Sequence, residues 1–169
     1  MLQTPGTYVP VAAGPAQGTF EAMESSRTDL ALLAVRVVVG LTFLLHGQDK
    51  LGDLSGTEQG FDGMGIPAPG VMAPFVAALE TVGGIALIVG ALAPVFAIGL
   101  AINMLVAALT AHIDNGFFVA DGGYELVLLL GVSSIAIAIA GAGRYSVDAT
   151  IGIARRVPGY PGGERRSLA

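Results

Sequence analysis

Four long apolar stretches alternate with short polar segments along the chain. They cover residues 29–51, 74–91, 94–114 and 122–140, each close to the roughly 20 residues that a helix needs to cross a bilayer. A buried helix of a soluble protein could explain one such stretch, but four in succession argue against a soluble core. The pattern predicts an all-α protein, built as an antiparallel bundle of four transmembrane helices.

Composition agrees with a membrane protein and narrows its chemistry. The 169 residues are 53% apolar and 12% charged, whereas about 25% charged is typical of soluble domains. The chain has no cysteine, which excludes disulfides, thiolate catalysis and iron–sulfur clusters, so redox chemistry requires a bound cofactor or a partner subunit. The net charge is −5, and the sequence has no segment in which basic residues alternate with aromatic ones. We therefore expect no nucleic acid partner.

We expect one membrane domain over residues 28–148. Residues 1–27 lack the basic and apolar regions of a signal peptide and are rich in Pro, Gly, Thr and Ala, which predicts a mobile tail. Residues 149–169 form a basic tail. Between the first two helices, residues 52–73 are rich in Gly and Pro, and the sequence leaves open whether they form a lid or a flexible loop.

The distribution of charge predicts the orientation of the helices. Basic residues precede the first helix or follow the fourth. They are Arg27, Arg144, Arg155, Arg156, Arg165 and Arg166. Acidic residues fill the connections between the first and second helices and between the third and fourth, at Asp53, Glu58, Asp62, Asp114 and Asp121. Because basic residues favour the cytoplasmic side, we expect a multi-pass protein of the cell membrane with both termini in the cytoplasm.

A layer of ionisable residues crosses all four predicted helices at one depth, toward the outer leaflet. Its members are His46, Lys50, Glu80, His112, Asp114 and Glu125. Lys50 at a helix end can reach the interface, and Glu125 in a first turn favours the helix dipole, so both also have structural explanations. Glu80 lies well inside an apolar helix and requires a partner, which Lys50 or either histidine can supply.

Two further polar residues, Asn103 and Arg36, lie inside the predicted helices. Asn103 and His112 are nine residues apart and therefore face opposite sides of an ideal helix. We expect His112 to face the bundle through a loosened final turn, because the turn signal Asn115-Gly116 follows. Arg36 can pair with Asp29 or with the cytoplasmic end of the fourth helix, or extend to the inner interface, and we expect a structural salt bridge rather than a ligand contact.

The polar layer is compatible with several ligands. A quinone headgroup, such as that of menaquinone, requires a hydrogen-bond donor and a proton-accepting carboxylate near an apolar slot, and the layer meets these needs best. We expect Glu80 and His112 to handle protons, and a ligand site formed by His46, Lys50, Glu80, His112 and Glu125. A metal fits less well because no Glu-x-x-His pair occurs, and a haem requires two histidines on facing positions. A lipid or protein pocket without catalysis fits nearly as well.

The chain resembles the DoxX family of small four-helix membrane proteins. The resemblance rests on Arg36, Gly40, Phe43, Gly47, Lys50 and Leu51, on Gly65-Ile66-Pro67, on Glu80, Gly83, Gly84 and Gly90, on His112 and Glu125, and on residues 143–148. It implies a bacterial membrane bundle with a link to redox work, since relatives include a subunit of a thiosulfate:quinone oxidoreductase. Mycobacterial members look associated with superoxide dismutase and a sulfurtransferase in the response to oxidative stress. We assign structural roles to Arg36, Gly83, Gly84, Asn103, Arg144 and Asp148.

Two functional hypotheses follow. The first is a membrane component of a quinone-linked redox or oxidative-stress system that works with a protein partner. The second is a non-catalytic membrane scaffold or accessory subunit that tethers a partner, through residues 52–73 or the basic tail. Membrane lipids are expected as partners in both cases, and a homo-oligomer is compatible with either.

Overall fold

The computed structural model describes residues 15–153, with side chains from residue 26 onward. The described part is helical and contains no strand, which confirms the all-α class. Its helices are α1 (Pro15–Gly52), α2 (Leu54–Gly63), α3 (Pro69–Val89), α4 (Ala93–Ala107), α5 (Glu125–Ala140) and α6 (Val147–Thr150). The first 14 residues of the predicted tail and residues 154–169 of the basic tail lie outside the described residues.

Three of the predicted membrane helices reach spanning length. Ser26–Gly52, Pro69–Val89 and Ala93–Asn115 are each long and apolar enough to cross a membrane. The fourth, α5, is equally apolar but has only 16 residues. Within the described residues, the structure therefore has three candidate spans and one shorter apolar helix.

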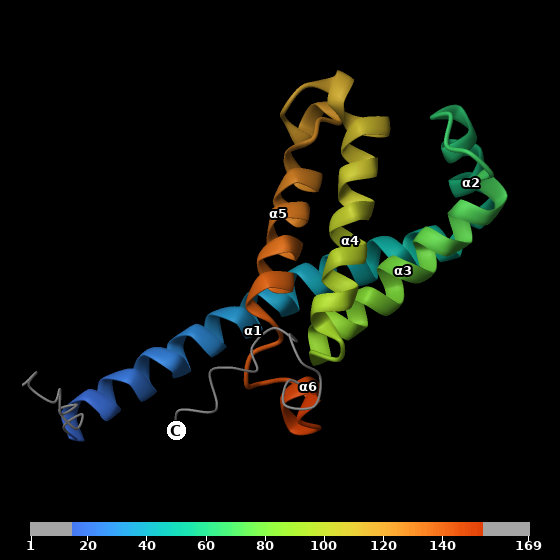
Figure 1. Ribbon diagram of the computed structural model, residues 1–169. Helices are drawn as coiled ribbons and strands as arrows, with labels where there is room; N and C mark the ends of the chain where they lie inside the picture. Colours follow the sequence, from blue (N-terminus) through green and yellow to red (C-terminus); the bar gives the residue numbers. More distant parts are fainter. Residues whose placement is uncertain (1–14, 154–169) are drawn as a thin grey trace, which may run out of the picture.

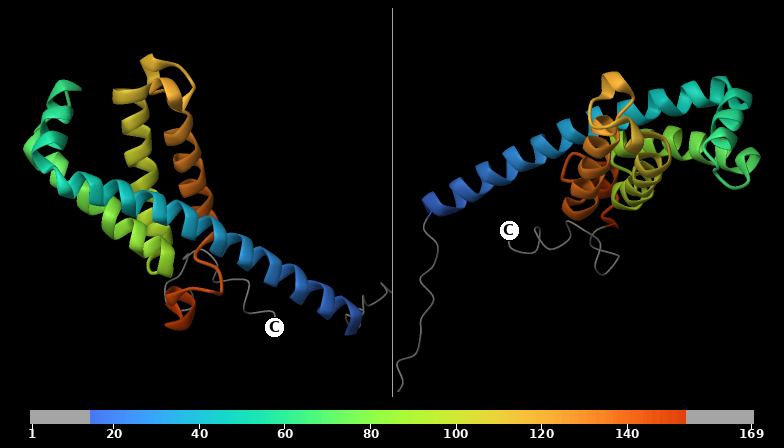
Figure 2. Two further views of the ribbon diagram at one scale, coloured as in Figure 1. Left: turned by 180° about the vertical axis from the view of Figure 1, so that it is seen from behind. Right: turned by 90° about the horizontal axis from the view of Figure 1, so that it is seen from above.

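The helices associate as two antiparallel pairs. α1 runs along α3, and α4 runs along α5, in the view of Figure 1 and in both views of Figure 2. The second pair stands at a steep angle to the first, so the four helices do not share one axis. The first part of α1 extends well beyond the other helices. This splayed arrangement differs from the regular bundle that the sequence predicted.

Glycines allow α1 and α3 to approach closely. A methyl group placed on Gly84 would lie 2.6 Å from the carbonyl oxygen of Gly40, and one on Gly47 would meet Thr81. Gly83 instead faces the side chain of Leu100 on α4. Gly83 and Gly84 thus pack against two different helices, as small residues do where membrane helices meet.

Two helices begin earlier than the sequence predicted. α1 starts at Pro15 rather than residue 29, so residues 15–27 of the predicted tail are helical. Proline is favourable at the first helical position, and the good helix formers Ala, Gln, Glu and Met outnumber Gly18 and the β-branched Thr19 in the turns that follow. α3 starts at Pro69 rather than residue 74, and Pro74 lies inside it. The predicted start coincides with the second proline, whereas in the structure the first proline occupies the favourable initial position.

The segment between α1 and α3 is largely helical. α2 begins after Asp53, whose side chain accepts a hydrogen bond from the backbone N–H of Gly56 at 2.8 Å. Glycine disfavours a helix interior, and the composition of residues 52–73 predicts a lid or a flexible loop rather than a helix. The N-cap and the contact of α2 with α3 stabilise the helix in spite of its glycines.

The α-helical part of α4 is shorter than predicted. It ends at Ala107 and continues as a π-helical turn, Ala108–His112, and a 3₁₀ turn, Ile113–Asn115. The final turn is therefore loosened before His112, as predicted. α5 begins at Glu125 rather than residue 122, because Gly122 takes a left-handed conformation.

We predict that Gly84→Ala destabilises the protein by about 1–3 kcal/mol, because the added methyl group meets backbone atoms of α1 that cannot move aside. Thermal unfolding in detergent measures the change. Gly131→Ala in α5 is the matched control, since its methyl group would meet only the Met104 Cβ atom at 3.4 Å. Equal unfolding temperatures for the two variants would contradict the proposed packing.

Candidate functional site

Lys50, Glu80 and Asn103 form a polar cluster where α1, α3 and α4 meet, which we call the Glu80 cluster. The Lys50 Nζ atom lies 2.6 Å from Glu80 Oε2. The Asn103 Nδ2 atom donates to Glu80 Oε1 at 2.8 Å. Both oxygens of one carboxylate therefore have a partner from a different helix, which satisfies a charge that is costly in an apolar environment.

The two charged residues of the cluster differ in exposure. The side chain of Glu80 is 4% exposed, whereas that of Lys50, in the last turn of α1, is 24% exposed. A lysine ammonium has three N–H donors, and one of them is used on Glu80. The open side of the Glu80 cluster is thus its lysine, which retains the capacity to bind a hydrogen-bond acceptor.

The structure does not bring His112, Glu125 or His46 into hydrogen-bond contact with Glu80. His112 Nδ1 lies 2.6 Å from the carbonyl oxygen of Gly122, and Glu125 Oε2 accepts a hydrogen bond from the Val119 N–H at 3.0 Å. Both side chains therefore bond the loop between α4 and α5. His46 is exposed on α1.

Asn103 takes the position that we had expected for His112. Its face of α4 is turned toward α3, and His112, nine residues further on, is the last residue of the π-helical turn. The loosened turn did not bring His112 to Glu80. Sequence analysis assigns Asn103 only a structural role, although an amide inside an apolar helix is itself a signal of a buried polar partner.

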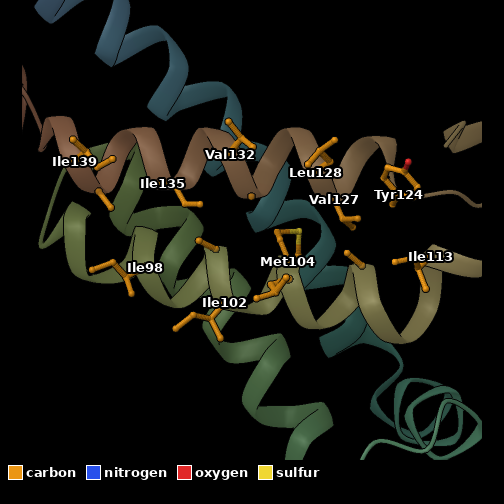
Figure 3. Close-up of a pocket in the computed structure, with 15 residues that line it drawn as sticks. Ile98, Ile102, Met104, Ile113, Tyr124, Val127, Leu128, Val132, Ile135 and Ile139 are labelled. Carbon is orange, nitrogen blue, oxygen red and sulfur yellow. The ribbon is translucent and has the colours of Figure 1, made fainter. Parts of the chain in front are cut away.

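An apolar groove of about 760 Å³ runs between α4 and α5. Figure 3 shows isoleucines of both helices on its walls and the oxygen of Tyr124 at one end. None of the predicted ligand residues lines the groove, and Asn103 is absent from its walls. The groove and the Glu80 cluster are therefore separate features.

Arg36 braces the opposite end of the helix pair. It is 1% exposed, and its guanidinium donates to the backbone carbonyl groups of Leu87, Ala142 and Tyr145. Arg36 thus ties the end of α3 to the chain that follows α5. Of the expected partners, the chain at the end of the fourth helix is the one found. It contributes backbone carbonyl oxygens, and the carboxylate of Asp148 also interacts electrostatically with Arg36.

Asp148 and Arg144 complete this brace. The carboxylate of Asp148 accepts from the N–H groups of Leu92 and Ala93, at 2.8 and 3.2 Å, and so caps the start of α4. The Arg144 N–H donates to Asp29 Oδ1 at 3.0 Å, and its guanidinium lies over the Tyr145 ring. These contacts explain the segment around residues 143–148 as a structural feature.

Within the part of the chain that the structure describes, no three His, Asp or Glu side chains are grouped to hold a metal ion. The arrangement at Glu80 instead offers a carboxylate, an amide and an ammonium group, which suit a hydrogen-bonding ligand.

Comparison with known proteins gives three findings. A sequence model of the DoxX family matches residues 31–113. "Putative oxidoreductase CatD" of Bacillus subtilis (strain 168) is 29% identical over 120 residues, which cover 71% of this chain and 86% of that protein. "Inner membrane protein YqjF" of Escherichia coli (strain K12) is 31% identical over 120 residues, 71% of this chain and 91% of that protein. No solved structure matches the chain.

We predict that Lys50→Met destabilises the protein by roughly 2–4 kcal/mol, because it leaves the buried charge of Glu80 without its counter-charge. The double variant Lys50→Met/Glu80→Gln should recover most of this loss, since no unpaired charge remains and Gln still accepts from Asn103. Unfolding in detergent measures both variants, with Arg27→Met as the control at an exposed cation. A double variant as unstable as the single one would contradict the ion pair's assigned role.

Proposed function

The chain belongs to the DoxX family, and on this premise we propose that it is an integral membrane component of a quinone-linked redox system. The observation that carries the proposal is the Glu80 cluster, in which a carboxylate on α3 is bonded by side chains of α1 and α4 among apolar helices. Ionisable residues within membrane helices are costly, and they mark ligand or proton sites more often than they mark packing.

In this proposal Lys50 binds the headgroup and Glu80 exchanges protons. A quinone carbonyl is a neutral acceptor, and the ammonium of Lys50 has N–H groups that are not used on Glu80. Reduction of a quinone consumes two electrons and two protons, and a carboxylate in direct contact with the donor is suited to proton transfer. Asn103 orients that carboxylate through its hydrogen bond at Oε1.

The electrons would come from a partner redox protein. The chain has no cysteine, and the Glu80 cluster holds no side chain that is oxidised or reduced in ordinary enzyme chemistry. The name of the relative CatD describes an oxidoreductase, which supports a redox role for this chain at the level of a proposal. His112 and Glu125 are assigned no headgroup contact, because both bond the loop between α4 and α5.

We further propose that α5 is a fourth span and that both termini are cytoplasmic. The acidic residues Asp53, Asp62 and Asp121 lie at the end of the molecule where α1 gives way to α2 and α4 to α5. Arg27 and Arg144 lie toward the other end. This asymmetry follows the positive-inside rule.

Lys50→Met is expected to weaken the binding of a short-chain menaquinone analogue to the purified protein by roughly 10- to 100-fold, because a hydrogen bond to a charged group contributes about 1.5–3 kcal/mol. Titration by fluorescence or calorimetry measures the affinity. The variant Lys50→Met/Glu80→Gln should show the same loss of affinity for the menaquinone analogue, in a protein whose stability is restored.

Two variants serve as controls for this titration. Glu58→Gln makes the same kind of change on the exposed face of α2 and should leave the affinity unchanged. His112→Ala should also leave it unchanged. Wild-type affinity in Lys50→Met/Glu80→Gln would refute the headgroup site.

Single cysteines introduced into the cysteine-free chain test the orientation. We predict that a membrane-impermeant maleimide labels Asp62→Cys in intact cells but labels Thr150→Cys only after the membrane is opened, because acidic connections face outward and basic ends inward. Both positions are exposed in the structure. The reverse labelling pattern would contradict the proposed topology.

A non-catalytic scaffold is the second candidate. The observation in its favour is the first part of α1, which extends beyond the other helices and is available to a partner protein (Figure 2). In that case removal of residues 1–25 abolishes co-purification of the partner, and variants of the Glu80 cluster retain it. Under the quinone proposal, variants of the Glu80 cluster lose affinity for the menaquinone analogue, and removal of residues 1–25 leaves that affinity unchanged.

A further inference from the structure

The loop between α4 and α5 presents apolar side chains outward. In this aromatic loop (residues 116–124), Phe117, Phe118 and Val119 are 45%, 63% and 53% exposed. The Phe117 ring meets the rings of Phe118 and Tyr124 edge to face, at centroid distances of 5.4 and 5.5 Å. A contiguous apolar patch of this kind is unfavourable in water and indicates contact with a partner or a membrane.

The same loop satisfies much of its own backbone. The N–H groups of Tyr124 and Glu125 donate to the carbonyls of Gly116 and Phe117, at 3.1 and 2.9 Å. A side chain on Gly123 would collide with the Gly116 carbonyl, so glycine permits this close return of the chain. Further turn bonds are Asp121 N–H to Phe118 O, Gly122 N–H to Val119 O and Gly123 N–H to Phe118 O.

His112 and Glu125, which the sequence analysis assigns to a ligand site, add hydrogen bonds to the backbone of this loop. His112 bonds the carbonyl of Gly122, and Glu125 accepts from the N–H of Val119. Because a carbonyl oxygen only accepts, the proton of this bond is on His112 Nδ1. Backbone that enters the apolar part of a membrane must have its polar groups satisfied by the protein, and this loop meets that requirement to a large extent.

The length of α5 gives a reason for the loop to enter the membrane. Its 16 residues rise about 24 Å, whereas the hydrocarbon core is about 30 Å thick. About 6 Å of apolar surface is therefore missing at the ends of this helix. The aromatic loop directly precedes α5 and can supply that surface.

We propose that the aromatic loop is a membrane anchor, with Phe117, Phe118 and Val119 inserted at the boundary between headgroups and acyl chains. The occupant of this surface is the lipid bilayer, because the patch continues the outward-facing apolar residues of the π-helical and 3₁₀ turns after α4 and of α5. These are Leu109, Ile113, Leu128 and Leu129, each 48–64% exposed. Aromatic side chains are enriched at this depth. Asp121, exposed on the same loop, remains in water.

Tryptophan probes in lipid nanodiscs test the anchor, since the chain has no native tryptophan. Phe118→Trp is the probe, Asp121→Trp is the matched control on the polar side of the same loop, and Val132→Trp marks the middle of α5. Quenching is measured with phospholipids brominated at a shallow or a deep acyl position and with aqueous iodide. Far-ultraviolet circular dichroism checks that each variant is folded, and Val119→Trp replaces any Phe118→Trp protein that is not.

The anchor predicts that shallow bromines quench Phe118→Trp several-fold more strongly than Asp121→Trp, that iodide shows the reverse order, and that deep bromines act mainly on Val132→Trp. Iodide quenching of Phe118→Trp as strong as that of Asp121→Trp would place the loop in water and overturn the proposal. Shielding of Phe118→Trp from both bromines and iodide would also overturn it, because a protein then covers the patch. The test does not involve quinone, so the outcome is independent of the proposed function.

Discussion

The close approach of α1 to α3 is the constraint on which the rest of the structure depends. Gly40 and Gly84 meet backbone to backbone, with no room for a side chain at either position. The same face of α1 carries Arg36 at one end of its contact with α3 and Lys50 at the other end. Because the helices are so close, both cations reach partners on α3 that longer separations would deny them.

Arg36 and Lys50 of α1 differ in how many of their N–H donors are hydrogen-bonded. The guanidinium of Arg36 donates to several backbone carbonyl groups and is almost fully buried, so it holds helix ends together. Lys50 makes one bond to Glu80 and remains partly exposed. The Lys50 ammonium therefore keeps N–H groups that are not used on Glu80. Buried polar groups thus lie at both ends of the α1–α3 pair.

The splayed arrangement of the two helix pairs separates features that one bundle would have joined. α4 contacts Glu80 through Asn103 and then leads away from α3 toward the loop before α5. His112 and Glu125 are carried along and pair with the backbone of that loop. The expected single layer of ionisable residues thus becomes two groups, one that holds an ion pair and one that stabilises a turn.

The sequence by itself determined the helical class, the long apolar segments, the need of Glu80 for a partner and the packing role of Gly83 and Gly84. The length and composition of each apolar run determine these properties, although of the four predicted spans only three reach spanning length in the described residues. Only the tertiary structure decided that Asn103 rather than His112 reaches Glu80, and that the pairs cross steeply. The rotation of each helix and its crossing angle depend on how side chains of two helices interlock, and the π-helical turn that ends at His112 shifts the helix phase. Neither is encoded in the pattern of a single segment.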